Sequence, residues 1–233
     1  MENPWIEFAK NYDNNNLVLE TEKSIIAEFN TTAKEDFKIH TNIAPAPFMG
    51  NFENSEIVIL MLNPGYDPKE NERGFYEKFK SYWINEIQRK KSSKHSLFCL
   101  EEEYCEYSDY WFKKLTPLIH ISSNEKISEK ISKIQLFPYH SKSYKKIPAS
   151  LIKKYGFDKY LPSQLYNFEI VKKAMERNAI IIIPRAKKQW FEAIKGLSEY
   201  PNKYITNSYQ NIILSENNLG KETFNLLKKK LNS

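Results

Sequence analysis

The stretch Glu56-Ile-Val-Ile-Leu-Met-Leu-Asn-Pro-Gly-Tyr66 decides the fold class of this 233-residue chain. Its continuous apolar run, rich in β-branched residues, is typical of a strand buried on both faces, as in parallel sheets. Asn63-Pro64 ends the strand, because proline lacks an amide donor and keeps the preceding residue out of the helical region. We therefore expect Asn63 at the carboxyl end of a buried strand, where open α/β sheets bind their ligands.

The rest of the chain predicts strands that alternate with helices. Further strands are expected at 131–137, 179–183 and 204–206. Helices are expected at 76–89, 101–119, 163–177, 186–197 and 217–231, and within 1–40 on either side of the Asn-rich stretch 13–16. Loops or polar links are expected at 41–55, 67–74, 91–100 and 122–130. This alternation indicates an α/β protein whose parallel sheet is covered on both faces.

Composition limits the class of protein further. Hydrophobic residues make up 41% of the chain, enough for the core of one domain. No apolar run approaches the roughly 18 residues that span a bilayer, and the N-terminus lacks a signal peptide, so we expect a cytoplasmic protein with no membrane partner. The two cysteines, Cys99 and Cys105, match neither a disulfide framework nor a usual zinc spacing, and we expect reduced thiols.

The net charge of +6 is unevenly distributed. Residues 1–139 hold 17 basic and 22 acidic side chains, a net of −5, whereas residues 140–233 hold 18 and 7, a net of +11. A basic half with interleaved aromatic residues is typical of a nucleic-acid-binding surface. Solvated helix faces loaded with lysine would give the same count, so both interpretations stay open at this point.

The residues around the first strand also carry a family resemblance. Ile59-Leu-Met-Leu-Asn-Pro-Gly-Tyr66, with Pro47-Phe-Met-Gly50 upstream, resembles the first active-site motif of the uracil-DNA glycosylase superfamily. It is closest to the mismatch-specific and thymine-DNA glycosylase branch, whose strand ends in Asn-Pro-Gly. The resemblance implies one domain over 1–233, a three-layer α/β/α sandwich with a central four-stranded parallel sheet. It also implies an N-terminal helical extension at 1–40 and an insertion at about 67–130.

The same resemblance implies roles for the residues of this motif. Asn63 would position a water for attack on the sugar carbon of a flipped-out nucleotide, because its amide oxygen can accept a hydrogen bond. Asp67 is a second catalytic candidate, as a carboxylate in the same loop. Gly65 and Tyr66 would bind the base, Tyr66 by stacking, and Phe48 is placed with them. Asn63 could instead simply cap a turn, since Asn-Pro is a common turn start.

Two later segments complete the candidate site. At the end of the second strand, the resemblance implies base recognition by Gln135 and DNA contacts by the loop that follows. His140 there could protonate a leaving base. The stretch 205–215 falls where the superfamily has its second motif, but it lacks the His-Pro-Ser or Asn-Pro-Ser sequence; Asn207 is the best substitute for base binding. The expected DNA-binding residues are Ser141, Lys142, Ser143, Lys145, Arg185, Ser208 and Tyr209.

The resemblance thus implies a DNA glycosylase, which we expect to be monofunctional because no lysine occupies the attacking position of the motif. We also expect a monomer that needs no metal or organic cofactor, and two cysteines cannot ligate the four-cysteine iron–sulfur cluster of some branches. The insertion suggests a bulky target, such as a modified cytosine in viral DNA. A non-catalytic nucleic-acid-binding module on the same fold is the alternative. A small nucleotide hydrolase or transferase is a third interpretation, but the sequence contains neither the glycine-rich phosphate loop nor the carboxylate cluster that would support it.

Overall fold

The computed structural model describes residues 1–88, 94–104 and 109–233, with Asp109 described by its backbone only. Cys105 lies outside these residues, and Cys99 is a buried free thiol. The chain forms two compact units. The first comprises 1–47, 62–92 and 135–169, and the second comprises 48–61, 93–134 and 170–233. No helix in the described part of the chain is long and apolar enough to cross a membrane.

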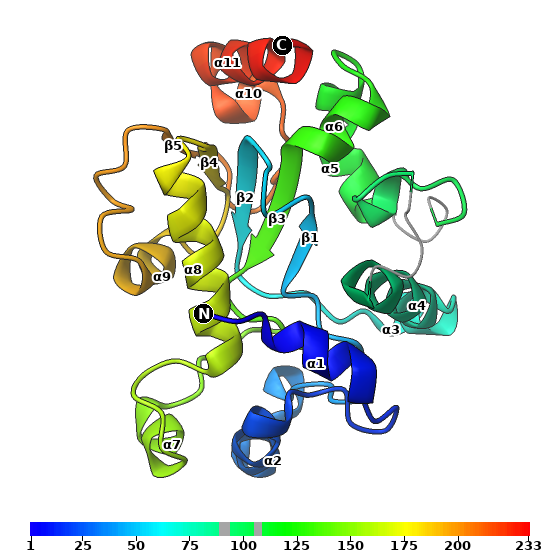
Figure 1. Ribbon diagram of the computed structural model, residues 1–233, viewed down its shortest axis with the longest axis vertical. Coiled ribbons are helices and arrows are strands. Elements are labelled where there is room, and N and C mark those ends of the chain that lie inside the picture. Colours follow the sequence, from blue (N-terminus) through cyan, green and yellow to red (C-terminus); the bar gives the residue numbers. More distant parts are fainter. Residues whose placement is uncertain (89–93, 105–108) are drawn as a thin grey trace. The chain divides into compact units, whose positions relative to one another are not determined.

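A five-stranded mixed sheet is the centre of the second unit (Figure 1). Its order is β1-β3-β2-β4-β5, with bounds Phe48–Gly50, Ile131–Gln135, Ile57–Met61, Ile180–Ile183 and Lys203–Ile205. β2 pairs in parallel with β4, and β4 with β5, whereas β1 is antiparallel to β3. The predicted α/β class is confirmed, but the prediction of four parallel strands is wrong, because β1 was expected to be a loop.

The central strands are buried as their sequences predicted. Every residue of β2, β3 and β4 is buried. Alternate residues of β2 and β4, such as Ile57, Ile59 and Ile182, join one apolar cluster with the helices of this unit. The indole of Trp190 donates to Met61 O at 3.0 Å. This hydrogen bond connects α9 (Lys187–Ala193), the helix that follows β4, to the end of β2.

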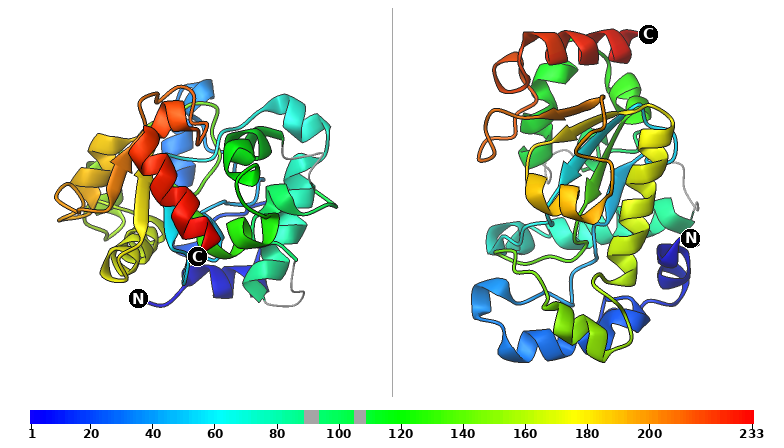
Figure 2. Two further views of the ribbon diagram at one scale, coloured as in Figure 1. Left: turned by 90° about the horizontal axis from the view of Figure 1, so that it is seen from above. Right: turned by 90° about the vertical axis from the view of Figure 1, so that its left-hand side faces the viewer.

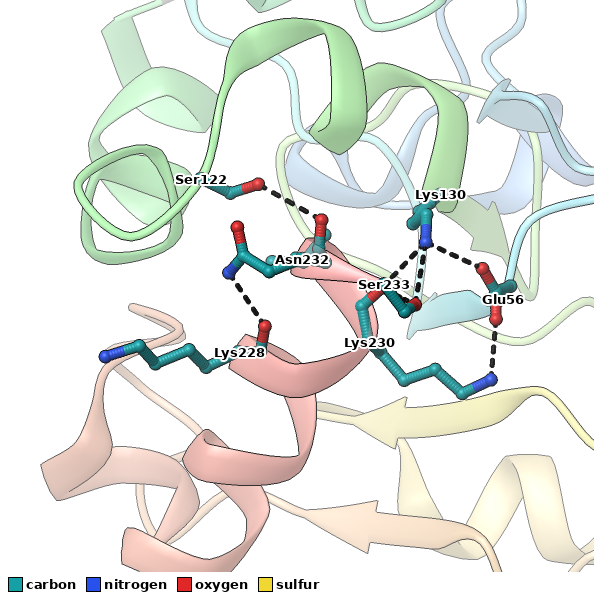
Figure 3. Close-up of polar contacts among 8 residues, drawn as sticks. Glu56, Ser122, Lys130, Lys228, Lys230, Asn232 and Ser233 are labelled. Carbon is teal, nitrogen blue, oxygen red and sulfur yellow. Dashed lines mark hydrogen bonds and ion pairs between the residues drawn. The ribbon is translucent and has the colours of Figure 1, made fainter.

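In the described part of the second unit, the sheet is accompanied by the end of α8 (Pro162–Glu176) and by the helical segments η3 Phe98–Leu100, α5 Asp109–Ile119, α6 Asn124–Lys130, α9 Lys187–Ala193, α10 Glu216–Leu219 and α11 Lys221–Asn232. α11 (red in Figure 2) packs against α6. Figure 3 shows Glu56 accepting from Lys130 Nζ at 3.1 Å and Lys230 Nζ at 2.6 Å, so one carboxylate joins both helices to the start of β2.

The first unit is mainly helical. It contains α1 Pro4–Asn11, η1 Glu20–Glu22, α2 Lys23–Thr32, η2 Glu35–Phe37, α3 Pro68–Glu72, α4 Phe75–Gln88 and α7 Ala149–Lys154. α8, Pro162–Glu176, begins in this unit and ends in the other. α1 packs on α4 and α2 on α7. The loops that follow β2 and β3 in the chain also belong to this unit.

Several predicted boundaries are wrong, each for a local reason. α6 forms where a polar link was expected, because Ser123 caps it by accepting from Lys126 N although Ile127 is its one apolar residue. α3 likewise begins at a cap, Asp67, inside a predicted loop. The predicted helix 217–231 is two helices, since Gly220 takes a φ of 79° between them. Of the helix expected at 101–119, residues 101–104 form turns, 105–108 lie outside the described residues, and α5 spans Asp109–Ile119. The helix expected at 186–197 is shorter, since α9 ends at Ala193.

Candidate functional site

Two loops of the first unit are joined directly beyond the ends of β2 and β3. Phe137 N donates to Leu62 O at 2.9 Å, just after the two strands end. Tyr66 N then donates to Ser141 O at 3.1 Å, and Gly65 and Ser141 form an isolated parallel bridge. The Asn-Pro-Gly turn and the Pro-Tyr-His-Ser loop therefore form one hydrogen-bonded frame.

The side-chain amide of Asn63 is held within this frame by two hydrogen bonds that its nitrogen donates. Nδ2 donates to Pro64 O and to Ser141 Oγ, both at 3.0 Å, and Ser141 Oγ donates in turn to Ser143 O at 3.0 Å. Both amide hydrogens are therefore used, which fixes the plane of the group. In the described part of the chain no protein donor reaches Oδ1 of this half-buried residue. An asparagine that merely caps a turn would use that oxygen to accept a backbone N–H.

His140 is buried behind the turn. Its Nδ1 lies 2.8 Å from Gly65 O. A carbonyl oxygen only accepts, so Nδ1 carries the proton and donates. The backbone carbonyl of His140 accepts from His40 N at 2.9 Å. The imidazole of His140, which was predicted to protonate a leaving base, therefore donates to Gly65 O in this structure. The backbone of the same residue binds the segment at His40.

Tyr66 lies in a stack of flat rings. The imidazole of His40 stacks on it with ring centroids 3.7 Å apart, and Tyr76 lies parallel to it at 5.8 Å. Tyr76 also meets the ring of His140 edge-on at 5.2 Å. Partial burial lowers the pKa of His40, the nearby Glu35 opposing this, so the imidazole is neutral at neutral pH. His40 thus covers one face of the ring expected to stack on a base.

The loop after Tyr66 is organised by Tyr76 and a carboxylate. Asp67 N donates to Tyr76 Oη at 2.8 Å, and Tyr76 Oη donates to Glu70 Oε2 at 3.4 Å. Burial, then the charge of Asp67, raises the pKa of Glu70. Burial also raises the pKa of Tyr76. Asp67 Oδ1 accepts from Lys69 N at 2.9 Å, so the carboxylate predicted to be catalytic caps α3.

The predicted phosphate-binding loop is tied to the segment before His40. Ser143 N donates to Asp36 O at 2.7 Å, and Lys142 Nζ pairs with Asp36 Oδ1 at 2.9 Å. The hydrogen bond to Asp36, and then its charge, raise the pKa of Lys142. Lys145 Nζ lies 5.7 Å from the ring centroid of Phe37. Of these two lysines, only Lys142 has its charge balanced by a carboxylate in the structure.

Gln135 lies in the same unit as Asn63 but is deeply buried. Its backbone N donates to Pro47 O at 2.9 Å, and its backbone O accepts from Asn167 Nδ2 at 2.7 Å. Its side-chain Oε1 is buried and accepts no hydrogen bond from any described residue. The residues that the structure brings to Asn63 therefore include Gly65, Tyr66, His140 and Ser141 among those predicted.

The remaining predicted residues belong to the second unit. Phe48 begins β1 and is buried. Asn207 Nδ2 donates to Asn217 O at 2.9 Å, and Ser208 N to Asn218 Oδ1 at 2.7 Å. Arg185 and Tyr209 lie together in this unit, since Arg185 Nε donates to Tyr209 O at 3.1 Å.

Sequence reasoning missed the residues that hold these loops: Asp36, His40, Glu70, Tyr76, Asn167 and Asn218. A lone His before Thr41 and a tyrosine on a predicted core helix carried no signal that would have marked them as partners of Tyr66 and His140. In comparisons with models of protein families, with curated proteins and with solved structures, the chain has no match.

Proposed function

We propose that this protein is a monofunctional DNA glycosylase that hydrolyses the N-glycosidic bond of a flipped-out pyrimidine and leaves an abasic site. The observation that carries the proposal is the Asn63 amide. Its nitrogen is anchored on Pro64 O and Ser141 Oγ, so its oxygen is left to accept a hydrogen bond from water.

The chemistry asks little of the protein beyond orientation. Glycosidic cleavage passes through an oxocarbenium-like state, so a water held beside the sugar carbon and a stabilised leaving base suffice. The water oxygen forms a bond to the sugar carbon as the bond to the base nitrogen breaks. The base leaves with that electron pair, and the proton that the water gives up passes through solvent to the departing base. Asn63 Oδ1 accepts a hydrogen bond from the attacking water, while His140 positions Gly65 O.

The proposal extends to the target and the setting. The proposed base is a modified cytosine, such as one in viral DNA. We propose that the enzyme is a cytoplasmic monomer and that its fold is a three-layer α/β/α sandwich. The long segment 67–130 between the first and second predicted strands supports a bulky target. Release of plain uracil with no release of modified cytosine would contradict this part of the proposal.

The test is base release from DNA duplexes that carry uracil, a thymine mismatch, or a cytosine bearing a methyl, hydroxymethyl or glucosyl group, with the free base detected by mass spectrometry. We expect release from one of these by the wild-type chain and a loss of at least about 100-fold in Asn63→Ala, because the water loses its orientation. Ser141→Ala, which removes one of the two anchors, should lose about tenfold.

Asn71→Ala is the matched control, since Asn71 is an exposed residue of the next helix, α3. Its release rate should equal that of the wild type. Equal rates in Asn63→Ala and Asn71→Ala would refute the assigned role of Asn63.

A second candidate is a nucleic-acid-binding module without catalysis. Two observations favour it: His40 covers one face of Tyr66, and Asp67 is used as the cap of α3. DNA binding with no release from any of the substrates would support this candidate over the glycosylase.

A further inference from the structure

Two cationic side chains of the second unit, Lys114 and Arg185, donate hydrogen bonds to the same short loop, residues 209–211. Arg185 Nε donates to Tyr209 O at 3.1 Å, and its NH2 donates to Gln210 O at 3.2 Å. Lys114 Nζ, from α5, donates to Asn211 Oδ1 at 3.1 Å. Three consecutive residues of the loop thus accept from two side chains that are 71 positions apart in the sequence, Lys114 and Arg185.

The positive charge at this place is not balanced. No side chain in the described part of the chain places a carboxylate within ion-pair distance of Lys114 or Arg185. Partial burial, and then the nearby charge of Arg185, lower the pKa of Lys114. Like charges repel, so an anion beside this pair would be stabilised by both cations.

The loop that accepts hydrogen bonds from the pair is pre-formed. Asn218 is buried, and its Nδ2 donates to Asn211 O at 2.8 Å and to Ile213 O at 2.9 Å. Its Oδ1 accepts from Ser208 N. Ala186, directly after Arg185, takes a left-handed φ of 58°, a conformation that is unfavourable for a non-glycine residue. Strain of this kind persists where surrounding contacts over-determine the backbone.

An aromatic ring stands beside the cations. The side chain of Tyr209 is 71% exposed, although its backbone carbonyl is held by Arg185. Lys114 Nζ also lies 5.0 Å from the ring centroid of Tyr110, which is 42% exposed. Adjacent cations with exposed aromatic rings are the combination that proteins use to hold a sugar–phosphate backbone and stack on an unpaired base.

We propose that Lys114 and Arg185 form a phosphate subsite that binds the backbone of DNA, with Tyr209 stacking on an unpaired base next to that phosphate. This inference rests on the proposed function in one respect, that DNA is the substrate. It adds Lys114 and Asn218 to the residues of interest: Lys114 contacts the phosphate, and Asn218 positions the loop.

The test is binding of a labelled DNA duplex that carries one unpaired base, measured by fluorescence anisotropy over a series of salt concentrations. The double variant Lys114→Gln/Arg185→Gln should bind more weakly and should reduce the slope of log affinity against log salt by about 1, because the pair contacts one phosphate. Arg185→Lys keeps the charge but loses the planar fork, so its slope should stay near that of the wild type.

The matched control is Lys195→Gln/Lys221→Gln, which removes the same charge from two exposed lysines of the same unit. An equal slope in the two double variants would overturn the subsite. Circular dichroism checks that the double variant has folded; if it has not, Lys114→Gln alone, which leaves the hydrogen bonds of Arg185 to the loop in place, should still weaken binding and lower the slope. A nucleoside monophosphate that binds the wild type as tightly as the DNA does, but not the double variant, would overturn the assignment to a polymer.

The outcome is separable from that for the proposed glycosylase. Asn63→Ala should bind DNA with the wild-type salt slope while its base release falls by at least about 100-fold, so the slope and the release rate test the two proposals separately. A changed salt slope in a chain that releases no base would leave the subsite standing and would refute the catalytic proposal alone.

Discussion

A substitution of Gly65 can distinguish the role of the Asn63 turn in folding from its role in ligand binding. The φ of Gly65 lies outside the left-handed region, and a Cβ added to this residue meets no atom within 4 Å. The fold therefore does not require a glycine here. We expect Gly65→Ala to unfold at the wild-type urea concentration but to release base at least about tenfold more slowly, because the methyl group stands where the ligand approaches the backbone. Wild-type release by this variant would show that the turn does not touch the substrate.

At the same scale, the residues that could be predicted are those that end a strand. Asn63 and His140 each follow a buried apolar run, and strand ends gather at one edge of an α/β sheet. His40 and Asp36 could not be predicted, because they come from a segment with no hydrophobic period and reach the site through backbone hydrogen bonds. The use of Asp67 as a helix cap was missed because α3 is too short to show a period.

At the scale of elements, β1 shows why a single substitution can matter to the sheet. Gly50 ends this strand with a φ of 88°, and a Cβ there would lie 2.5 Å from Ile131 O of β3. We expect Gly50→Ala to lower the free energy of unfolding by about 2–4 kcal/mol, from the left-handed φ and the displaced strand together. Urea denaturation measures it, and Gly65→Ala is the same substitution at an unrestricted site. Equal stability of the two variants would contradict this account of β1.

The elements that could be predicted from sequence are the long or continuously apolar ones. β2 and β4 were recognised because their apolar runs have no polar face, and α4 because its aromatic residues recur at helical spacing. β1 and η3 have three residues each, so no period can appear in them. β1 forms because β3 offers it a backbone to pair with, which is a property of the fold and not of the three residues.

At the scale of the whole molecule, a buried carboxyl group makes stability depend on pH. Glu22 is 0% exposed and accepts from Tyr139 Oη at 2.6 Å, Ser163 N at 2.6 Å and Ser163 Oγ at 3.0 Å. Burial raises its pKa to about 7, against these three donors. The cluster joins η1, the residue before His140 and the first turn of α8, so its stability is shared by the segments that hold the candidate site.

The sign of the pH dependence follows from that raised pKa. The protonated Glu22 is favoured in the folded chain, so its contribution is complete below the unfolded carboxyl pKa and is lost as pH rises through about 7. The loss is on the order of 3 kcal/mol, since each unit of pKa difference is worth about 1.4 kcal/mol. Urea denaturation at about pH 5 and about pH 8 should show this fall in the wild type and in Glu20→Gln, whose carboxylate is exposed, and a change smaller by this amount in Glu22→Gln. His40, with a lowered pKa, loses stability as pH falls, and Glu70, with a raised pKa, loses it as pH rises. Both are present in all three chains and cancel in the comparison. A fall of equal size in Glu22→Gln would assign the pH dependence to another group.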